Sequence, residues 1–330
     1  MIISPTTINH EIMSTITTKD ADDSKHHCAA CGDSDDGGGS LKACTACNLV
    51  KYCDRTCQIA HRPAHMKACK KRAAELFDEK LFKQPPNEDC PICYLRIPIN
   101  LDQNRYQSCC GKMLCLGCVR AHFVAAPDTE KLKCVFCRTG APSSDEEQIK
   151  RMKKRVEAND AQAMAPLGSY YQLGMMGLRQ DHAKALGLFH KAAKFGHHHA
   201  HLILSLCYQT GRIVEIDTSK ATYHAQLGAM AGNVQARNNL GCDEENAGNM
   251  DRAFKHWMIS ANDGCGLAMK AVQEGHKNGF VTEDDYAKTT RAYGNSIDEM
   301  KSDDRDRAVA FQSSRGMGAV PPRLPVILSE

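Results

Sequence analysis

The chain has 330 residues, with 42 Lys and Arg against 39 Asp and Glu, which gives a formal net charge of +3. Fifteen of its 18 cysteines fall between Cys28 and Cys137. A secreted disulfide scaffold could use as many, but the chain starts without a basic region and apolar run, and no stretch approaches the ~20 apolar residues that span a bilayer. We expect no secretory signal, no membrane partner, and a reducing compartment, cytoplasmic or nuclear.

Metal binding would change this charge balance. Fifteen metal-bound thiolates and four zinc ions would shift the net charge to roughly −4, because ligating thiols are deprotonated. A general nucleic-acid binder needs a basic face. The sequence therefore argues against a nucleic-acid partner.

The first 70 residues hold a cluster of possible metal ligands. Residues 1–25 are polar and lack a sustained apolar period, which predicts disorder. The stretch that follows has two Cys-x2-Cys pairs, whose turns can aim both sulfurs at one ion, and two pairs spaced by four, which share one helix face. The ligands are Cys28, Cys31, Cys44, Cys47, Cys53, Cys57, His65 and Cys69.

This pattern resembles a MYND zinc finger, which we place at residues 26–70. Arg62 stands where the family usually has a Trp that packs beside its peptide groove. His61 is an alternative ligand, but its spacing to Cys69 does not match one helical turn. The resemblance implies two structural zinc ions, one held by Cys28, Cys31, Cys53 and Cys57, and one by Cys44, Cys47, His65 and Cys69.

A stretch that begins as a basic amphipathic run at Lys70 ends at Pro85-Pro86. It predicts a linker helix over residues 71–87.

The central stretch holds three Cys-x2-Cys pairs and one adjacent pair. Four such half-sites make two closed tetrahedral sites, and closed sites fold the chain rather than catalyse. The order resembles a RING finger, which we place at residues 88–139. In that family the first and third pairs share one zinc and the second and fourth share the other. Carried over, Cys90, Cys93, Cys115 and Cys118 hold one ion, and Cys109, Cys110, Cys134 and Cys137 hold the second.

The RING resemblance also implies two partner contacts. Ile92 would lie in the groove that contacts a ubiquitin-conjugating enzyme. Arg138 would hydrogen-bond ubiquitin and hold the conjugate in a reactive pose. The chain departs from ligase-type members at Val135, where they favour proline.

Ser144 can cap a new helix, because Asp145, Glu146 and Glu147 suit its first turn. We predict a linker helix within residues 140–159, with Lys150 to Arg155 on a solvated face.

The remaining chain repeats, and Gly196, Gly232 and Gly264 close successive units at steps of 36 and 32 residues. Each unit fits two antiparallel helices, in which small residues allow close approach and Leu, Tyr and Trp fill between layers. Asp181 and Asp217 are placed as N-caps and the glycines as C-caps. The pattern resembles Sel1-like repeats, relatives of the tetratricopeptide solenoid, over residues 160–281. It implies a groove for protein partners.

A fourth unit begins at Ala268 and loses the pattern after Gly279. We predict one C-terminal capping helix over residues 282–311, because a stack of repeats needs its last apolar face covered. Residues 312–330 are predicted to be a tail.

Two features of the repeats could be interpreted as a catalytic site or a metal site. Cys207, Cys242 and Cys265 lack a motif that would place a base beside them, which favours buried packing over nucleophilic catalysis. The run from His197 to His201 follows a closing glycine, where a polar turn is expected more often than a metal site.

The sequence thus predicts a mostly α fold, in which two small zinc-stabilised cross-brace modules, MYND-like and RING-like, precede a Sel1/TPR-like α-solenoid. Four structural Zn²⁺ ions and no catalytic residue are expected. The first hypothesis is a protein-interaction scaffold that binds other proteins through the Sel1-like groove and the MYND finger. The alternative is a RING-type ubiquitin ligase that brings a conjugating enzyme to clients held by the repeats.

Overall fold

The computed structural model of the protein describes residues 27–33, 40–85 and 88–314. The chain divides into two compact units, residues 1–80 and residues 81–330. The disorder predicted for residues 1–25 lies outside the described residues, as does most of the predicted tail.

The first unit is a short hairpin followed by a long helix. Strands β1 (Lys42–Ala43) and β2 (Lys51–Tyr52) pair antiparallel, and α1 spans Arg55–Leu81. The unit's small core consists largely of ligand cysteines packed with Leu41 and Tyr52. Such a core is too small to fold a module without a metal or another staple.

The predicted start of a separate helix at residue 71 is wrong. Helix α1 begins within the finger and runs on without a break, and its last residue, Leu81, already belongs to the second unit. No Gly or Pro follows Cys69 to end the helix there, and Arg72 pairs with Glu75 and Glu79 along it.

The second unit opens with the central finger. After the 3₁₀ turn η3 (Leu101–Gln103), strands β3 (Asn104–Gln107) and β4 (Lys112–Cys115) pair antiparallel with Asn104 opposite Cys115. Helix α2 (Leu116–Ala125) follows directly. Its buried core is Cys90, Leu114 and Cys115, so here too the ligands are most of the core.

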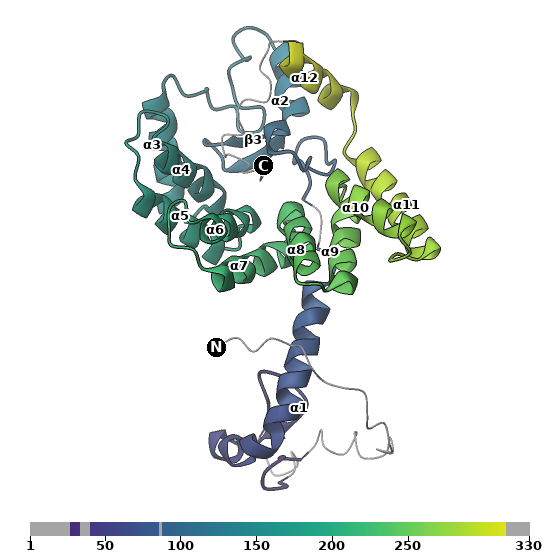
Figure 1. The fold of residues 1–330 in the computed structure, drawn as a ribbon. Coiled ribbons are helices and arrows are strands. Elements are labelled where there is room, and N and C mark those ends of the chain that lie inside the picture. Colours follow the sequence, from purple (N-terminus) through teal and green to yellow (C-terminus); the bar gives the residue numbers. More distant parts are fainter. Residues whose placement is uncertain (1–26, 34–39, 86–87, 315–330) are drawn as a thin grey trace. The chain divides into compact units, whose positions relative to one another are not determined.

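Paired helices form the rest of the unit in a curved row (Figure 1). The pairs α4/α5, α6/α7, α8/α9 and α10/α11 pack as hairpins, and neighbouring pairs pack on one another. Their bounds are α3 Asp145–Glu157, α4 Ala161–Leu173, α5 His182–Lys194, α6 His198–Thr210, α7 Thr218–Met230, α8 Val234–Asn246, α9 Met250–Asn262, α10 Gly266–Lys277 and α11 Glu283–Glu299.

The predicted caps of the repeats are confirmed. The Asp181 carboxylate accepts a hydrogen bond from the Lys184 amide, and Asp217 accepts one from the Lys220 amide. The three closing glycines have φ values between +82° and +96°, which disfavour any residue with a Cβ. Gly196, Gly232 and Gly264 are these residues.

Small residues admit aromatic rings between the paired helices, as predicted. A Cβ at Gly168 of α4 would lie 2.6 Å from the Phe189 ring of α5. A Cβ at Gly241 of α8 would lie 2.4 Å from Trp257 Nε1 of α9. The glycine of the repeated Leu-Gly pattern therefore lies where an aromatic side chain of the paired helix packs.

Ser144 caps helix α3 as predicted, because its hydroxyl accepts from the Glu147 amide. This helix is not a free linker. Ile149 and Met152, three residues apart, are buried against Leu167 and Tyr170 of α4. Helix α3 therefore covers the first repeat.

The single capping helix predicted over residues 282–311 is wrong. Helix α11 ends at Glu299, and α12 (Asp303–Ser314) is a separate helix, so residues 312–314 are helical rather than tail. Ser302 caps α12 by accepting from the Arg305 amide, and acidic residues fill its first turn. Helix α11 packs on α9 and α10, whereas α12 packs on α2 of the finger (Figure 1).

The fold class is the predicted one: helices dominate, and a solenoid follows cysteine-rich modules. Among the described residues, no helix has the length and apolar character needed to cross a bilayer.

Candidate metal centres and the cavities beside them

The structure brings together the four sets of ligands that the sequence predicts. In each set the ligand atoms all lie within 4.8 Å of one another. His65 belongs to its set, whereas His61 bonds the Tyr52 hydroxyl through Nδ1 at 3.1 Å. The sets are Cys28, Cys31, Cys53, Cys57; Cys44, Cys47, His65, Cys69; Cys90, Cys93, Cys115, Cys118; and Cys109, Cys110, Cys134, Cys137.

The spacing within each set fits a tetrahedral ion. Zinc–sulfur bonds of about 2.3 Å place the sulfurs of a tetrahedral site ~3.8 Å apart. The first unit has Sγ–Sγ distances of 3.4 Å for Cys31–Cys53 and 3.7 Å for Cys44–Cys69. The Cys47 sulfur lies 3.2 Å from His65 Nε2.

The central finger has the same spacing. The Sγ–Sγ distance is 3.9 Å for both Cys90–Cys118 and Cys93–Cys115. In the other set it is 4.0 Å for Cys110–Cys134 and 3.3 Å for Cys109–Cys137. A disulfide would need about 2.05 Å, so these thiols are arranged as ligands rather than as cross-links. Their assignment to individual zinc ions stays a prediction.

One backbone turn builds four of the half-sites. The residue after the second cysteine has φ between +56° and +81°, and its amide donates to the carbonyl of the first cysteine over 2.8–2.9 Å. This left-handed turn folds the two sulfurs to the same side of the chain. The residues that adopt it are Gly32, Asn48, Tyr94 and Arg138.

Hydrogen bonding favours one thiolate in each set. Burial of Cys28 raises its pKa, but amide hydrogen bonds from Cys31 and Ala30 outweigh this and lower the pKa to about 6. In the same set, burial and the neighbouring thiols raise the pKa of Cys57 to about 12. Clustered thiolates repel one another, so a divalent cation is needed to hold all four ionised. Cys44, Cys90 and Cys137 also have a lowered pKa.

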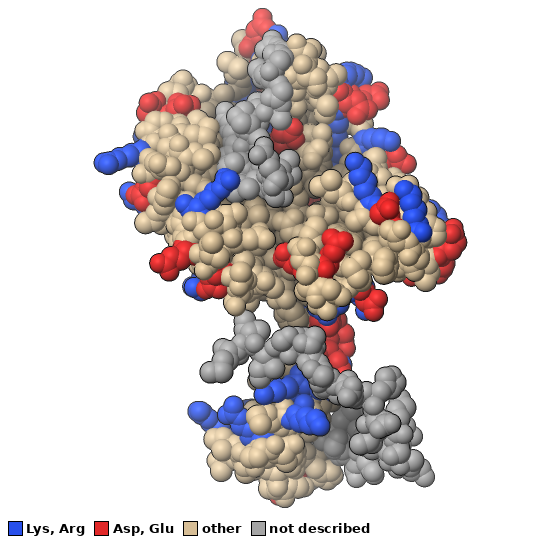
Figure 2. Space-filling view, in the orientation of Figure 1, with Lys and Arg blue, Asp and Glu red and all other residues tan. Residues whose placement is uncertain are grey.

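The first finger carries a basic surface. Lys and Arg side chains gather on the first unit (Figure 2). Arg62 is exposed on α1, as are Lys67, Lys70 and Lys71. The position that the family usually fills with Trp is thus a solvated cation here.

The two predicted partner contacts lie in different surroundings. Ile92 is half-buried and packs against the finger core. Arg138 is exposed, and its left-handed backbone is already explained by the cysteine turn that it completes. Their contact with a conjugating enzyme or ubiquitin stays a prediction.

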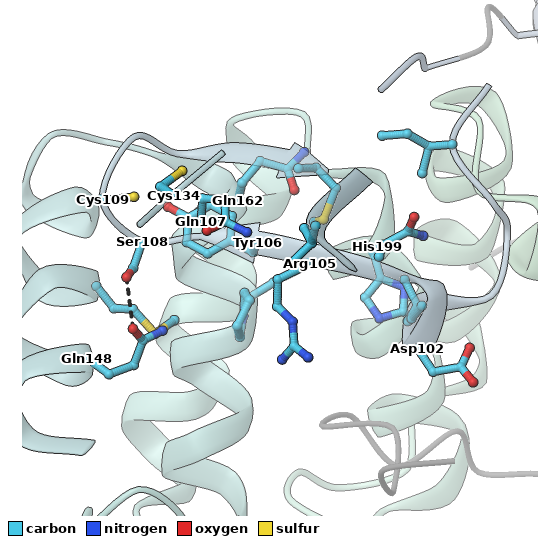
Figure 3. A pocket seen from close by; sticks show the side chains of 18 of the residues that line it. Asp102, Arg105, Tyr106, Gln107, Ser108, Cys109, Cys134, Gln148, Gln162 and His199 are labelled. Atoms are coloured by element: carbon cyan, nitrogen blue, oxygen red, sulfur yellow. Dashed lines mark hydrogen bonds between the residues drawn. The ribbon is translucent and has the colours of Figure 1, made fainter. Parts of the chain in front are cut away.

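Side-chain hydrogen bonds fasten the finger to the first helices of the solenoid. The Tyr106 hydroxyl donates to Asp160 over 2.9 Å, and the Ser108 hydroxyl donates to Gln148 over 2.9 Å (Figure 3). Arg155 donates to the Cys110 carbonyl over 3.0 Å. The predicted solvated face of α3 therefore carries part of an interface.

A second set of contacts fastens the finger to the last helices. Arg96 forms an ion pair with Asp263 over 2.6 Å and donates to the Ser296 hydroxyl over 2.7 Å. Arg305 of α12 donates to the carbonyl of Arg96 over 2.7 Å and to Cys93 Sγ over 3.5 Å. The solenoid thus holds the finger at both of its ends. Sequence reasoning missed these contacts, because their partners lie up to 212 residues apart.

Within the part of the chain that the structure describes, the space between the finger and the inner helices includes two cavities. The larger, about 840 Å³, is lined by Arg105 and Tyr106 of the finger and by Gln148, Gln162 and His199 of the solenoid (Figure 3). The smaller, about 660 Å³, lies against α6, α8 and α10 and is bordered by residues 98–103 and α12.

The histidine run is not the polar turn that was predicted. Helix α6 begins at His198, and His197, His199 and His201 are each only 8% exposed. The His197 ring caps α6 by accepting from the Ala200 amide, and His201 Nδ1 lies 3.0 Å from His224 Nδ1. The run fills the junction between repeats instead of facing water.

The three remaining cysteines differ in burial. Cys207 is buried, and burial raises its pKa to about 11, which disfavours a nucleophilic thiolate. Cys265 is half-buried. The burial predicted for Cys242 is wrong, because this residue lies on the exposed side of α8.

Family models match two parts of the chain, the first finger and the first two repeats. Residues 28–69 match the family model of the MYND finger. Residues 161–197 and 198–233 match that of the Sel1 repeat. The first unit therefore contains a finger of the structural zinc-binding type, and the second contains Sel1 repeats.

One curated relative is chitin synthase regulatory factor 3 of Schizosaccharomyces pombe. It is 34% identical over 77 residues, which are 22% of this chain and 8% of that protein. The chain thus matches less than a tenth of the relative's length.

Two solved structures are similar to parts of this chain. A Sel1 repeat protein from Oxalobacter formigenes is 23% identical with a TM-score of 0.41, covering 48% of this chain and 67% of its own. The antigen c5321 of uropathogenic Escherichia coli is 25% identical with a TM-score of 0.39, covering 51% of this chain and 36% of its own.

Proposed function

We propose that the protein is a zinc-binding scaffold that gathers other proteins on its repeats and on its MYND finger. The observation that carries this is that the solenoid contacts the central finger on two sides. Arg96 and Arg305 bond the finger to the last helices, and Arg155 bonds it to the first. Cavities of about 840 Å³ and 660 Å³ lie beside the inner helices, next to these contacts. Stacked repeats expose extended surfaces of this kind for binding proteins.

The predicted zinc ions have structural roles in this proposal. Sites closed by four protein ligands have no open position for substrate, so they fold the modules that meet the partners. The curated relative is by its name a regulator of an enzyme, and a scaffold that binds an enzyme could act in the same way.

The scaffold is tested by crosslinking the full chain to the proteins that it captures. We expect crosslinks from partners to concentrate on α4–α10, because these helices form the solenoid, with a second group on residues 28–69. Lys270 on α10 and Lys194 at the end of α5 supply reactive amines on the repeats. Crosslinks confined to residues 88–139 would show that the repeats only space the modules, and the proposal would fail.

A second candidate function is ubiquitin ligation by the central finger. Its support is the interleaved pairing of cysteine sets, first with third and second with fourth, together with an exposed Arg138 directly after Cys137. In this proposal Ile92 contacts the conjugating enzyme and Arg138 orients the conjugate, which accelerates transfer by positioning alone.

Ligation is tested with activating enzyme, ubiquitin and a panel of conjugating enzymes. We expect ubiquitin chains with the wild type, weaker recruitment for Ile92→Ala, and slower transfer with normal recruitment for Arg138→Ala. Arg179→Ala, remote in sequence from the finger, is the control and should remain active. Absence of chains across the panel with full zinc content would leave the scaffold alone. Chains that form equally with both variants would refute these residue roles.

A further inference from the structure

We propose that three carboxamides on α8, Gln235, Asn238 and Asn239, bind an extended uncharged peptide segment of a partner protein. The site is the cavity of about 660 Å³ against α6, α8 and α10. This inference rests on the proposed scaffold and specifies one of its binding sites and the chemistry of the ligand.

The three side chains form a row that the fold leaves unused. They lie at positions i, i+3 and i+4 of α8, which place them on one face. All three are half-buried and line the cavity, and none is hydrogen-bonded to another described residue. By contrast, the nearby Asn233 amide is engaged, since its oxygen accepts from the Ala236 amide over 2.7 Å. The described residues therefore leave the donors and acceptors of these three carboxamides available to a ligand.

Carboxamides match the hydrogen-bonding groups of a peptide backbone. Each offers one carbonyl acceptor and an NH₂ donor, and each peptide unit offers one donor and one acceptor. Gln235 and Asn239 are four residues apart, about 6 Å along the helix axis. An extended chain repeats every two residues, over about 6.6–6.8 Å. The row can therefore meet alternate peptide units along one edge of an extended strand.

Apolar side chains surround the row. Leu202 and Leu206 of α6 stand on one side, and Leu267 of α10 is 59% exposed on the other. Ile99 and Val309 contribute from the finger loop and from α12, and Val309 is 38% exposed. Successive side chains of an extended segment point in opposite directions and would contact these walls, which favours apolar residues in the ligand.

The charges at the cavity favour an uncharged ligand. The Arg305 guanidinium already donates to the carbonyls of Arg96 and Met300, and Lys301 is paired with Asp298. Asp306 is the remaining charged residue in the lining, and it is exposed. A nucleic acid or an acidic peptide would find no cluster of unpaired cations here.

The test uses full-length zinc-loaded protein and a library of acetylated, amidated hexapeptides assembled from Ala, Leu, Val, Ser and Gln. Peptides retained by immobilised protein are sequenced, and their Kd is measured by titration calorimetry. We expect wild-type protein to retain a subset, and Asn238→Ala/Asn239→Ala to weaken binding at least tenfold. Asn246→Ala, on the same helix but outside both cavities, is the matched control and should bind as the wild type does.

A second measurement does not depend on the folding of any variant. N-methylation of single backbone amides in a retained peptide should weaken binding at least tenfold at alternate positions, because it removes the donor and keeps the side chain. Equal affinity for all N-methylated forms, or for the double variant with normal zinc content and melting, would overturn the proposal.

Two further outcomes would also overturn it. One is that the library contains no binder, and partners still crosslinked to α4–α10 would then leave the scaffold standing while this site falls. The other is that deletion of residues 315–330 tightens peptide binding and a synthetic peptide of that sequence displaces the library ligand. The occupant would then be this chain's own C-terminal segment rather than a partner.

Discussion

Replacement of Cys115 by serine is expected to unfold the central finger and to lower the stability of the whole second unit. Cys115 is 1% exposed and belongs to the set formed with Cys90, Cys93 and Cys118. A structural zinc site contributes about 10–16 kcal/mol of apparent binding energy, comparable with the ~5–15 kcal/mol of net stability of a domain. Loss of one ligand should therefore abolish the site.

The effect should spread beyond the finger because the solenoid is bonded to it. Arg305 of α12 donates to Cys93 Sγ and to carbonyls of the same loop, and a Cβ at Gly117 of α2 would lie 2.8 Å from Arg305. Once the loop unfolds, α12 loses both its hydrogen-bond acceptors and its packing surface. Removal of several kcal/mol would lower the melting temperature by roughly 10 °C or more.

Native mass spectrometry and thermal melting followed by circular dichroism measure both effects. We expect four zinc ions in the wild type and three or fewer in Cys115→Ser, with an earlier helical transition. Cys53→Ser is the matched control, because it removes a ligand from the first unit and should leave the melting of the second unchanged. A Cys115→Ser protein with four zinc ions, or with the wild-type melting curve, would contradict the assignment.

The features that the sequence predicts well are those set by a few neighbouring residues. Cysteine pairs at fixed spacing fold into the same left-handed turn, and Asp181 and Asp217 cap the helices that follow them. The pairing of cysteine sets came from family resemblance, since spacing alone allows other pairings. Ser302 and the acidic residues after it cap α12, a local signal that the single helix predicted over residues 282–311 did not take into account.

The missed features depend on residues far apart in the chain. His199 is polar and follows a glycine turn, yet it is only 8% exposed, because it lies on the buried side of α6 rather than in a turn. Cys242 matches the small residues of the core, yet α8 turns it outward. No local pattern around Arg96 shows that Asp263 lies beside it, since 167 residues separate them. The enclosure of the finger by the solenoid is therefore a result of tertiary packing alone.

Substitution of Arg96 by methionine is expected to cost about 3–5 kcal/mol, as does removal of one partner from a buried ion pair. The Arg96 and Asp263 side chains are only 10% and 4% exposed, and their N–O distance is 2.6 Å. Methionine keeps the apolar volume but leaves the Asp263 carboxylate without its cation. This would loosen the finger from α9 and α11, because Arg96 also donates to Ser296 of α11.

The loss should depend on pH in a direction set by Asp263. Burial raises the pKa of Asp263, and the hydrogen bond and charge of Arg96 lower it. Without Arg96 the pKa of the folded protein rises further above the unfolded value of about 3.9. The folded variant then binds a proton that the unfolded chain releases, so its stability decreases as pH rises above about 4. Urea denaturation at pH 5 and pH 7.5 should show the larger loss at pH 7.5.

A double-mutant cycle separates the ion pair from general damage to the interface. Asp263→Leu in the Arg96→Met background removes the unpaired carboxylate and should recover most of the lost stability. Lys288→Met is the surface control, since its pair with Asp284 is 64% and 75% exposed and should contribute less than about 1 kcal/mol. If the Arg96 and Asp263 losses are instead additive and independent of pH, this ion pair does not hold the finger to the solenoid. The finger would then be held to the solenoid by α12 and by its hydrogen bonds to α3 and α4.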